Sequence, residues 1–210
     1  IAQCLVGSEM CIRDSIYITE LPYMQNVTTI GTRAFSISSN LRSLEYPKCL
    51  TDFTATSLDG GGNAKIRYIT FEDGCALNTL PEGLFSTYKE NNTNLKEQRE
   101  IKLPLSLKEL NMNVFCGSWN RTIVEIPHTD KDSLQLTLTD YGTTSKETIG
   151  KSLKMMYYTV HSFEVYRCLT ETFGVPRDHI TFHEEKVGWK LTGVKAVSYT
   201  HLRAHETLSD

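Results

Sequence analysis

A short phrase of apolar residues recurs along the first part of the chain and restricts its fold more than any other feature. The phrase has an aliphatic or aromatic residue, four other residues, and then phenylalanine or leucine. Its four copies are Ile30–Phe35, Phe53–Leu58, Leu80–Phe85 and Leu110–Phe115. A stretch of alternating apolar and polar residues follows each copy and usually ends at a proline. The last apolar residues before these ends, counting one incomplete earlier copy, are Leu21, Tyr46, Phe71, Leu103 and Ile126. Their spacing, mostly in the twenties, indicates a repeat architecture.

A period of this length leaves room for one short strand and one return segment in each repeat. Within the strand, alternation sends Leu44 and Tyr46 inward and Glu45 outward. A proline cannot donate a hydrogen bond to the neighbouring strand, so it is expected to end the strand. One repeat alone cannot bury its apolar residues, and the copies must therefore stack. The sequence predicts a β-rich solenoid of about four repeats over residues 16–128, with short parallel strands along one face and loops or short helices as returns.

The residue that ends each phrase is the second buried anchor of the repeat. Stacking should place Phe35, Leu58, Phe85 and Phe115 in one interior column. The longest step between repeats contains the polar insert Lys89–Asn94, which we expect to form a loop that bulges from the stack.

Three segments resemble the BspA-like class of leucine-rich repeats. They are Val27–Phe35 (VTTIGTRAF), Asn40–Pro47 (NLRSLEYP) and Leu103–Phe115 (LPLSLKELNMNVF). The likeness extends over roughly residues 18–127. The second repeat departs from it, because Gly60–Gly62 replaces the usual turn and Glu72 replaces the proline. The resemblance implies a leucine-rich-repeat solenoid that binds a protein or a glycan through an extended surface, without catalysis.

This resemblance places the expected binding surface on the outward side of the strands. The outward positions are Glu45, Thr70, Lys102 and Glu125, with Tyr68 nearby. We predict that these five residues contact the ligand. The alternative is that this face is merely solvated and that binding belongs to other repeats.

Composition excludes several classes of function. The chain has 22 Lys+Arg and 25 Asp+Glu residues, so it has no basic surplus for binding nucleic acid or an anionic membrane. No apolar run approaches the roughly 18 residues that a membrane span needs. The cysteines between the two ends form no CxxC pair and fit either buried thiols or two disulfides. They are Cys49, Cys75, Cys116 and Cys168.

Past Pro127 the phrase stops and the pattern changes. Leu134–Thr139 and Leu153–Val160 alternate like two strands, and the turn-prone stretch Gly142–Gly150 lies between them. This arrangement predicts a hairpin.

A helix and a third strand are expected after the hairpin. Ser162 can cap a helix whose apolar side carries Val165, Leu169 and Phe173, and Gly174 suits the position just past its end. Ile180–Phe182 alternates like a strand.

Hairpin, helix and strand in this order resemble the first two thirds of a ubiquitin-like β-grasp domain, and Phe173–Phe182 (FGVPRDHITF) is the most specific part of the likeness. The resemblance implies an incomplete ubiquitin-like α+β segment over residues 129–195. The alternative is a generic ββαβ segment.

The two ends of the chain are related to each other as DNA. When Ala196–Asp210 is reversed, each of its residues can be encoded on the strand opposite its partner in Ile1–Ser15, as His201 (CAT) is opposite Met10 (ATG). Both stretches resemble the translated end of a sequencing transposon. We therefore predict that residues 1–15 and 196–210 are translated adapter DNA, and we leave them out of the fold reasoning.

Two groups of residues invite a catalytic or metal-binding interpretation. His179 and His183 are four residues apart, which on a strand separates them by about 13 Å, too far for one ion. We interpret them as solvent-facing. Cys168 and His161 would need a nucleophile–base contact, but no oxyanion donor or orienting acid is suggested. We predict no catalytic residue, no metal site and no cofactor.

The leading hypothesis is a binding scaffold for a protein or surface glycan, with a lean toward an extracellular or cell-surface location. The alternative is an intracellular chaperone or adaptor, because leucine-rich repeats followed by a ubiquitin-like domain resemble the layout of tubulin-folding cofactor E.

Overall fold

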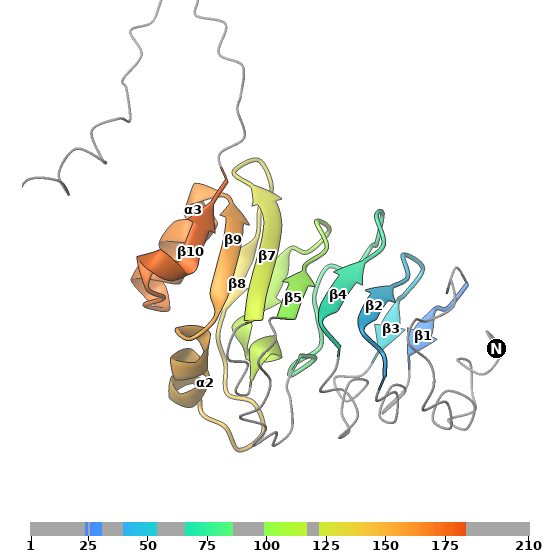
Figure 1. Cartoon of the computed structure of the whole chain (residues 1–210), viewed down its shortest axis with the longest axis horizontal. Coiled ribbons are helices and arrows are strands. Elements are labelled where there is room, and N and C mark those ends of the chain that lie inside the picture. Colours follow the sequence, from blue (N-terminus) through green and yellow to red (C-terminus); the bar gives the residue numbers. More distant parts are fainter. Residues whose placement is uncertain are drawn as a thin grey trace, which may run out of the picture.

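The computed structural model describes residues 24, 26–30, 40–53, 66–85, 99–116 and 122–183. In these residues, strands follow one another in sequence order along the longest axis of the molecule (Figure 1). Four of the main strands are each followed by a turn and a return segment, and this pattern repeats from strand to strand.

The main sheet has six strands, and every pairing in it is parallel. Its strands are β2 (Ser43–Tyr46), β4 (Tyr68–Phe71), β5 (Arg99–Lys102), β7 (Thr122–Thr129), β9 (Tyr157–His161) and β10 (Ile180–Phe182). Their spatial order is also their order in the chain, so each repeat contacts the one before it and the one after it. This is the β-rich repeat fold that the spacing of apolar residues predicts.

Shorter strands pair in the same parallel way on the return side, behind the main sheet in Figure 1. They are β1 (Thr29–Ile30) with β3 (Asp52–Phe53), and β6 (Glu109–Asn111) with β8 (Gln135–Thr137). A 3-10 helix, Met112–Phe115, follows β6. The core lies between the main sheet and these return segments.

The strand register confirms the expected alternation. Leu44, Ile69, Ile101, Val124 and Tyr158 are successive partners across five strands, and each is at most 2% exposed. Burying an aliphatic or aromatic side chain contributes about 1.5–3 kcal/mol. A shift of one residue in any strand would turn its apolar side chains to solvent, so this row fixes the register.

A β-turn follows four of the main strands at the same edge of the sheet. The closing bonds are Leu50 N to Pro47 O (3.1 Å), Cys75 N to Glu72 O (3.1 Å), Leu107 N to Pro104 O (3.4 Å) and Asp132 N to Thr129 O (2.9 Å). Glu72 stands where two other turns begin with proline. Its N–H donates to the Tyr46 carbonyl (2.8 Å), and its carboxylate accepts from Lys48 N (3.0 Å). Proline could make neither bond, so this departure from the repeat pattern ties two repeats together.

The second interior column is confirmed where the structure describes it. The Phe85 and Phe115 rings stack with centroids 5.5 Å apart, and both side chains are at most 1% exposed. Phe35 and Leu58 lie outside the described residues. The same applies to the Gly60–Gly62 turn and the Lys89–Asn94 insert.

The expectation that proline ends each strand is wrong at Pro127. β2 ends before Pro47 and β5 ends before Pro104, but β7 continues to Thr129. A bulge accommodates the proline, because the pairing passes from Ile126 opposite Val160 directly to Thr129 opposite His161. The missing N–H therefore falls in the irregular part of the ladder.

The hairpin expected in the C-terminal third is wrong. β8 pairs parallel with β6, and β9 pairs parallel with β7, so the two strands belong to different sheets. β10 then adds to β9, again in parallel. The main sheet thus runs past residue 129, and the ubiquitin-like interpretation, which needed the hairpin, is not confirmed.

The turn expected at Gly142–Gly150 is largely a helix, α2 (Lys146–Leu153). Ser145 caps it by accepting a hydrogen bond from Thr148 N, and Ile149 and Leu153 are buried one turn apart. α2 packs against Met112–Phe115, the return segment of the preceding repeat. It therefore takes the place of a return segment, and the strand expected from Leu153 begins at Tyr157.

The helix expected after Ser162 is confirmed. The Ser162 side chain accepts a hydrogen bond from Val165 N at the start of α3 (Phe163–Arg167), which continues as a π-helix, Cys168–Thr172. Gly174 follows with φ +66°. A 3-10 helix, Arg177–His179, leads into β10. Asp130 Oδ1 accepts from Ser162 Oγ and from Phe163 N at 2.7 Å each, which attaches the helix to the turn after β7.

Candidate functional site

The outer face of the main sheet carries the residues predicted to bind. Glu45 is opposite Thr70, and Lys102 is opposite Glu125, which is in turn opposite Thr159. Glu45 and Lys102 are exposed, and the other three are partly exposed. Glu45, Thr70, Lys102 and Glu125 thus lie on the outer face, as sequence alternation predicts. Their role in binding stays a prediction.

A second outward row contains the exposed aromatic residues of the face. Ser43, Tyr68, Glu100, Ile123 and Tyr157 are successive partners across five strands. Tyr68 is 51% exposed and Tyr157 is 41% exposed. Tyrosine combines an apolar ring with a hydroxyl and is enriched at protein interfaces. The two rings, three strands apart and separated by roughly 14 Å, define the width of an amphipathic platform.

Sequence reasoning identified Tyr68 but missed Tyr157, Glu100 and Ile123. Tyr157 was assigned to a hairpin strand, and only parallel pairing of β9 with β7 brings it to this face. The signal that could have found it is the alternation in Tyr157–His161, where Tyr158 and Val160 are buried like the inward residues of the earlier strands.

The charged side chains of the face form a weak ion pair. Lys102 Nζ lies 3.8 Å from Glu125 Oε1, and the two side chains are 55% and 37% exposed. An ion pair this open contributes less than about 1 kcal/mol. A ligand can therefore replace it at little cost.

Two ring pairs that include histidine lie beyond β7. The His179 ring lies tilted against the Tyr157 ring with centroids 4.4 Å apart, and its Nδ1 is 3.0 Å from the Lys154 carbonyl. His161 and His183 stack at 5.5 Å. The expectation that His179 lies on a strand and faces only solvent is wrong, because it belongs to the 3-10 helix before β10. Within the described ranges, no group of three His, Cys, Asp or Glu residues could hold a metal ion.

The cysteines that the structure describes are free thiols. Burial raises the pKa of Cys75 and of Cys168. The thiolate is the nucleophilic form, so both environments disfavour nucleophilic chemistry. This agrees with the sequence reasoning that set Cys168 and His161 aside.

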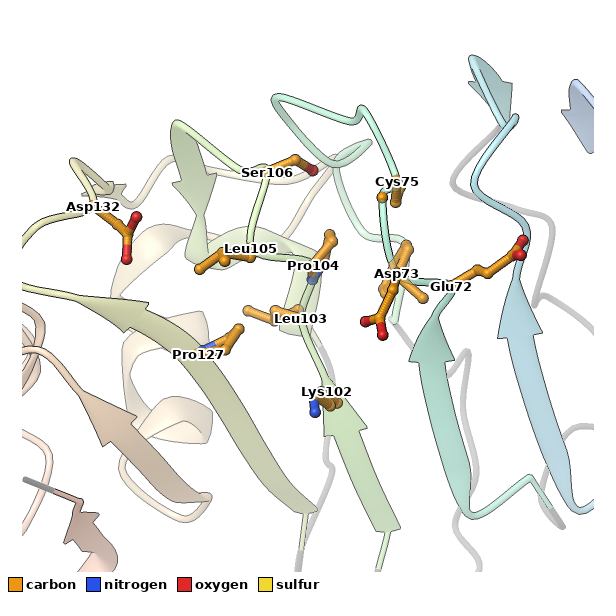
Figure 2. A pocket seen from close by; sticks show the side chains of 12 residues that line it. Glu72, Asp73, Cys75, Lys102, Leu103, Pro104, Leu105, Ser106, Pro127 and Asp132 are labelled. Carbon is orange, nitrogen blue, oxygen red and sulfur yellow. The ribbon is translucent and has the colours of Figure 1, made fainter. Parts of the chain in front are cut away.

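A groove of about 670 Å³ adjoins the strand face along the edge where the turns follow β4, β5 and β7. Its floor is apolar, from Phe71, Leu103, Pro104 and Pro127, and Lys102 connects it to the strand face. Figure 2 shows Asp73 and Asp132 on opposite sides of the groove, with Pro104 and Leu105 between them. Sequence reasoning did not find the groove, because it forms only where three successive turns stack.

Parallel strands in sequence order, a turn at one edge and a return segment behind define a repeat protein with one long strand face. The chain belongs to the BspA-type leucine-rich repeat family, whose model matches residues 8–132 in six copies. The spacing of apolar residues indicates about four repeats over residues 16–128, and the family model counts six copies over residues 8–132. The match begins inside residues 1–15, which lie outside the described part of the chain. Searches of curated proteins and of solved structures returned no match to the chain.

Proposed function

We propose that the chain is a non-catalytic solenoid scaffold that binds a protein or a surface glycan through the outer face of its main sheet. The observation that carries this proposal is the exposure of Tyr68, 51%, within a row of outward side chains. A half-exposed tyrosine between serine and glutamate gives a ligand an apolar surface and polar groups together.

The arrangement of the elements supports the same proposal. In Figure 1 the main sheet lies in front, while β8 and α3 lie behind it. Leu44 and Ile101 are buried on the side of the returns, while Tyr68 stays half-exposed on the opposite side. At the β9 end of that opposite side, His179 of the 3-10 helix before β10 contacts the Tyr157 ring. An open sheet face on a rigid stack is a preorganised surface, which lowers the entropic cost of binding.

The alternative role of intracellular chaperone or adaptor depended on a ubiquitin-like segment that begins with a hairpin. Because β8 pairs with β6 and β9 pairs with β7, the two strands form no hairpin, and this role loses its main support. No helix in the described residues is long and apolar enough to cross a bilayer. Catalysis is not part of the proposal, because the chain belongs to a leucine-rich repeat family, and such repeats serve as extended binding surfaces.

The test is a search for ligands followed by mapping with matched variants. The full chain is screened against a displayed library of random peptides and against a glycan array. Each ligand is then measured with Tyr68→Ala and Lys102→Ala. The controls are Phe163→Ala, an aromatic residue 55% exposed on α3, and Lys151→Ala, an exposed lysine on α2.

We expect Tyr68→Ala to weaken binding at least about fivefold, since buried aromatic anchors dominate interfaces. The control variants should change affinity less than twofold. Ligands that bind all four variants as well as the unchanged chain would contradict the proposal.

A further inference from the structure

The groove at the turn edge contains an exposed leucine at an unusual place. Leu105 is 54% exposed and follows Pro104 in the turn after β5, where the equivalent residues of two earlier turns are Lys48 and Asp73. Polar residues at those positions are hydrated, but Leu105 leaves an apolar side chain in solvent beside Pro127. This side chain and the proline form an apolar patch that a ligand could cover.

The carboxylates around this patch differ in whether they already accept hydrogen bonds within the protein. Glu72 accepts from Lys48 N, and in Figure 2 its carboxylate points away from the groove toward the neighbouring turn. Asp132 accepts from both Thr129 N (3.0 Å) and Thr129 Oγ1 (2.8 Å). These bonds lower the pKa of Asp132, which keeps it ionised. Both carboxylates are therefore fixed in position.

Asp73 is different, because within the described residues it makes no hydrogen bond or ion pair. It is exposed and lies in the turn that Gly74 closes with φ +84°. The cation of the groove, Lys102, is 3.8 Å from Glu125 on the strand face. The groove thus presents one uncommitted carboxylate next to an apolar patch, with a second carboxylate across from it.

We propose that this groove binds a basic side chain of a partner polypeptide at Asp73 while an adjoining apolar side chain of the partner packs on Leu105 and Pro127. The proposal rests on the scaffold function proposed above and adds the chemistry of the partner at the edge of the same face. Charge complementarity favours lysine or arginine, because the carboxylates at the groove outnumber its lysine. The volume, about 670 Å³, suits a few residues of an extended peptide.

The test uses the full chain and three fluorescein-labelled peptides. The first is Gly-Arg-Leu-Arg-Gly, which supplies both features of the partner. The second, Gly-Glu-Leu-Glu-Gly, reverses the charge, and the third, Gly-Arg-Ser-Arg-Gly, removes the apolar side chain. Fluorescence anisotropy at low ionic strength gives the affinities. We expect the first peptide to bind most tightly. Its affinity should fall as salt is added, because salt screens charges that are near solvent.

Variants then locate the bound peptide. Asp73→Asn keeps the shape of the side chain and removes its charge, and it should weaken the first peptide about two- to fivefold, the effect of losing an exposed ion pair. Asp178→Asn is the matched control, since Asp178 is an exposed carboxylate beside β10, at the other end of the sheet. Leu105→Ser should remove the preference for the leucine peptide over the serine peptide.

Three outcomes would overturn the proposal. One is equal binding of the basic and acidic peptides, or no binding of the basic peptide at millimolar concentration. Another is an equal loss of affinity for the basic peptide in Asp73→Asn and Asp178→Asn. A third is loss of the peptide in Tyr68→Ala but not in Asp73→Asn, which would move it to the strand face. The third outcome would contradict the groove proposal but not the scaffold function. The same holds if a ligand of the strand face binds Asp73→Asn and Leu105→Ser as tightly as it binds the unchanged chain.

Discussion

Replacing Phe85 and Phe115 by leucine, singly and together, measures whether neighbouring repeats stabilise each other. Each ring is at most 1% exposed, and their centroids are 5.5 Å apart with planes at 19°. Leucine keeps an apolar side chain of similar volume, so each single substitution should cost about 1 kcal/mol of unfolding free energy. The contact between the two rings adds about 0.5–1.5 kcal/mol beyond burial.

Either single substitution removes the contact between the two rings, so the second substitution in the double variant has no ring contact left to remove. The double variant should therefore be less destabilised than the sum of the two single variants, by about 0.5–1.5 kcal/mol. The assay is urea unfolding followed by circular dichroism, with the coupling free energy taken from the four proteins. Phe163→Leu serves as the control, because Phe163 is 55% exposed. Strict additivity of the two substitutions would refute the interior column, since independent residues add.

Two further predictions concern single positions. Burial lowers the pKa of His128, although its Nε2 lies 2.9 Å from the Leu107 carbonyl and Asp132 is nearby. The unfolded chain then takes up a proton more readily, so the unfolding free energy should fall as the pH drops below about 6.5, by at most about 1.4 kcal/mol per unit. His128→Gln should reduce this slope in urea titrations at several pH values, and an unchanged slope would count against it. Gly83→Ala should destabilise by about 1–3 kcal/mol more than Gly142→Ala, because both glycines have positive φ but only at Gly83 would a new Cβ meet the Tyr141 ring. Equal losses in thermal unfolding would refute that contact.

The repeated part of the fold could be predicted from the sequence because its signal is periodic. The inward positions of β2, β4, β5 and β7 follow from alternation, and their alignment follows from the spacing of Tyr46, Phe71, Leu103 and Ile126. The outward positions Glu45 and Lys102 follow from the same argument. Prediction succeeded here because each repeat must bury the same face against its neighbour.

The C-terminal third could not be predicted in the same way, because local alternation does not reveal which strand a segment pairs with. Gln135–Thr137 and Tyr157–His161 look like a hairpin when only their nearness in sequence is considered. One signal was present. Leu136 is five residues before Tyr141, which repeats the apolar spacing of the phrase with tyrosine in the last place. The Tyr141 ring lies against Gly83, which precedes Phe85 in the return segment of an earlier repeat.

The groove was beyond sequence reasoning for a related physical cause. Asp73, Leu105 and Asp132 are far apart in sequence and share no motif, and they come together because three turns close at the same edge of a parallel sheet. The middle residues of these turns, such as Asp73 and Leu105, are exposed, so they can differ between repeats without disturbing the stack. A variable edge beside an invariant strand register is where chemical specificity can be added to a repeat scaffold.

Polar contacts on the return side explain why the stack continues past residue 132, where the family match ends. Asn111 Nδ2 donates to Thr139 Oγ1 (2.7 Å), and the buried Asn113 donates to the same oxygen (2.9 Å) and to Glu82 (3.2 Å). These side chains belong to three successive repeats. An amide nitrogen buried without a partner would cost about 1–3 kcal/mol. The paired Asn113 nitrogen therefore stabilises its repeat through neighbours on both sides, while Asn113 Oδ1 is buried without a hydrogen-bond partner among the described residues. We therefore expect the strands that carry Tyr68 and Lys102 and the C-terminal third to gain or lose structure together when unfolding is followed by hydrogen exchange.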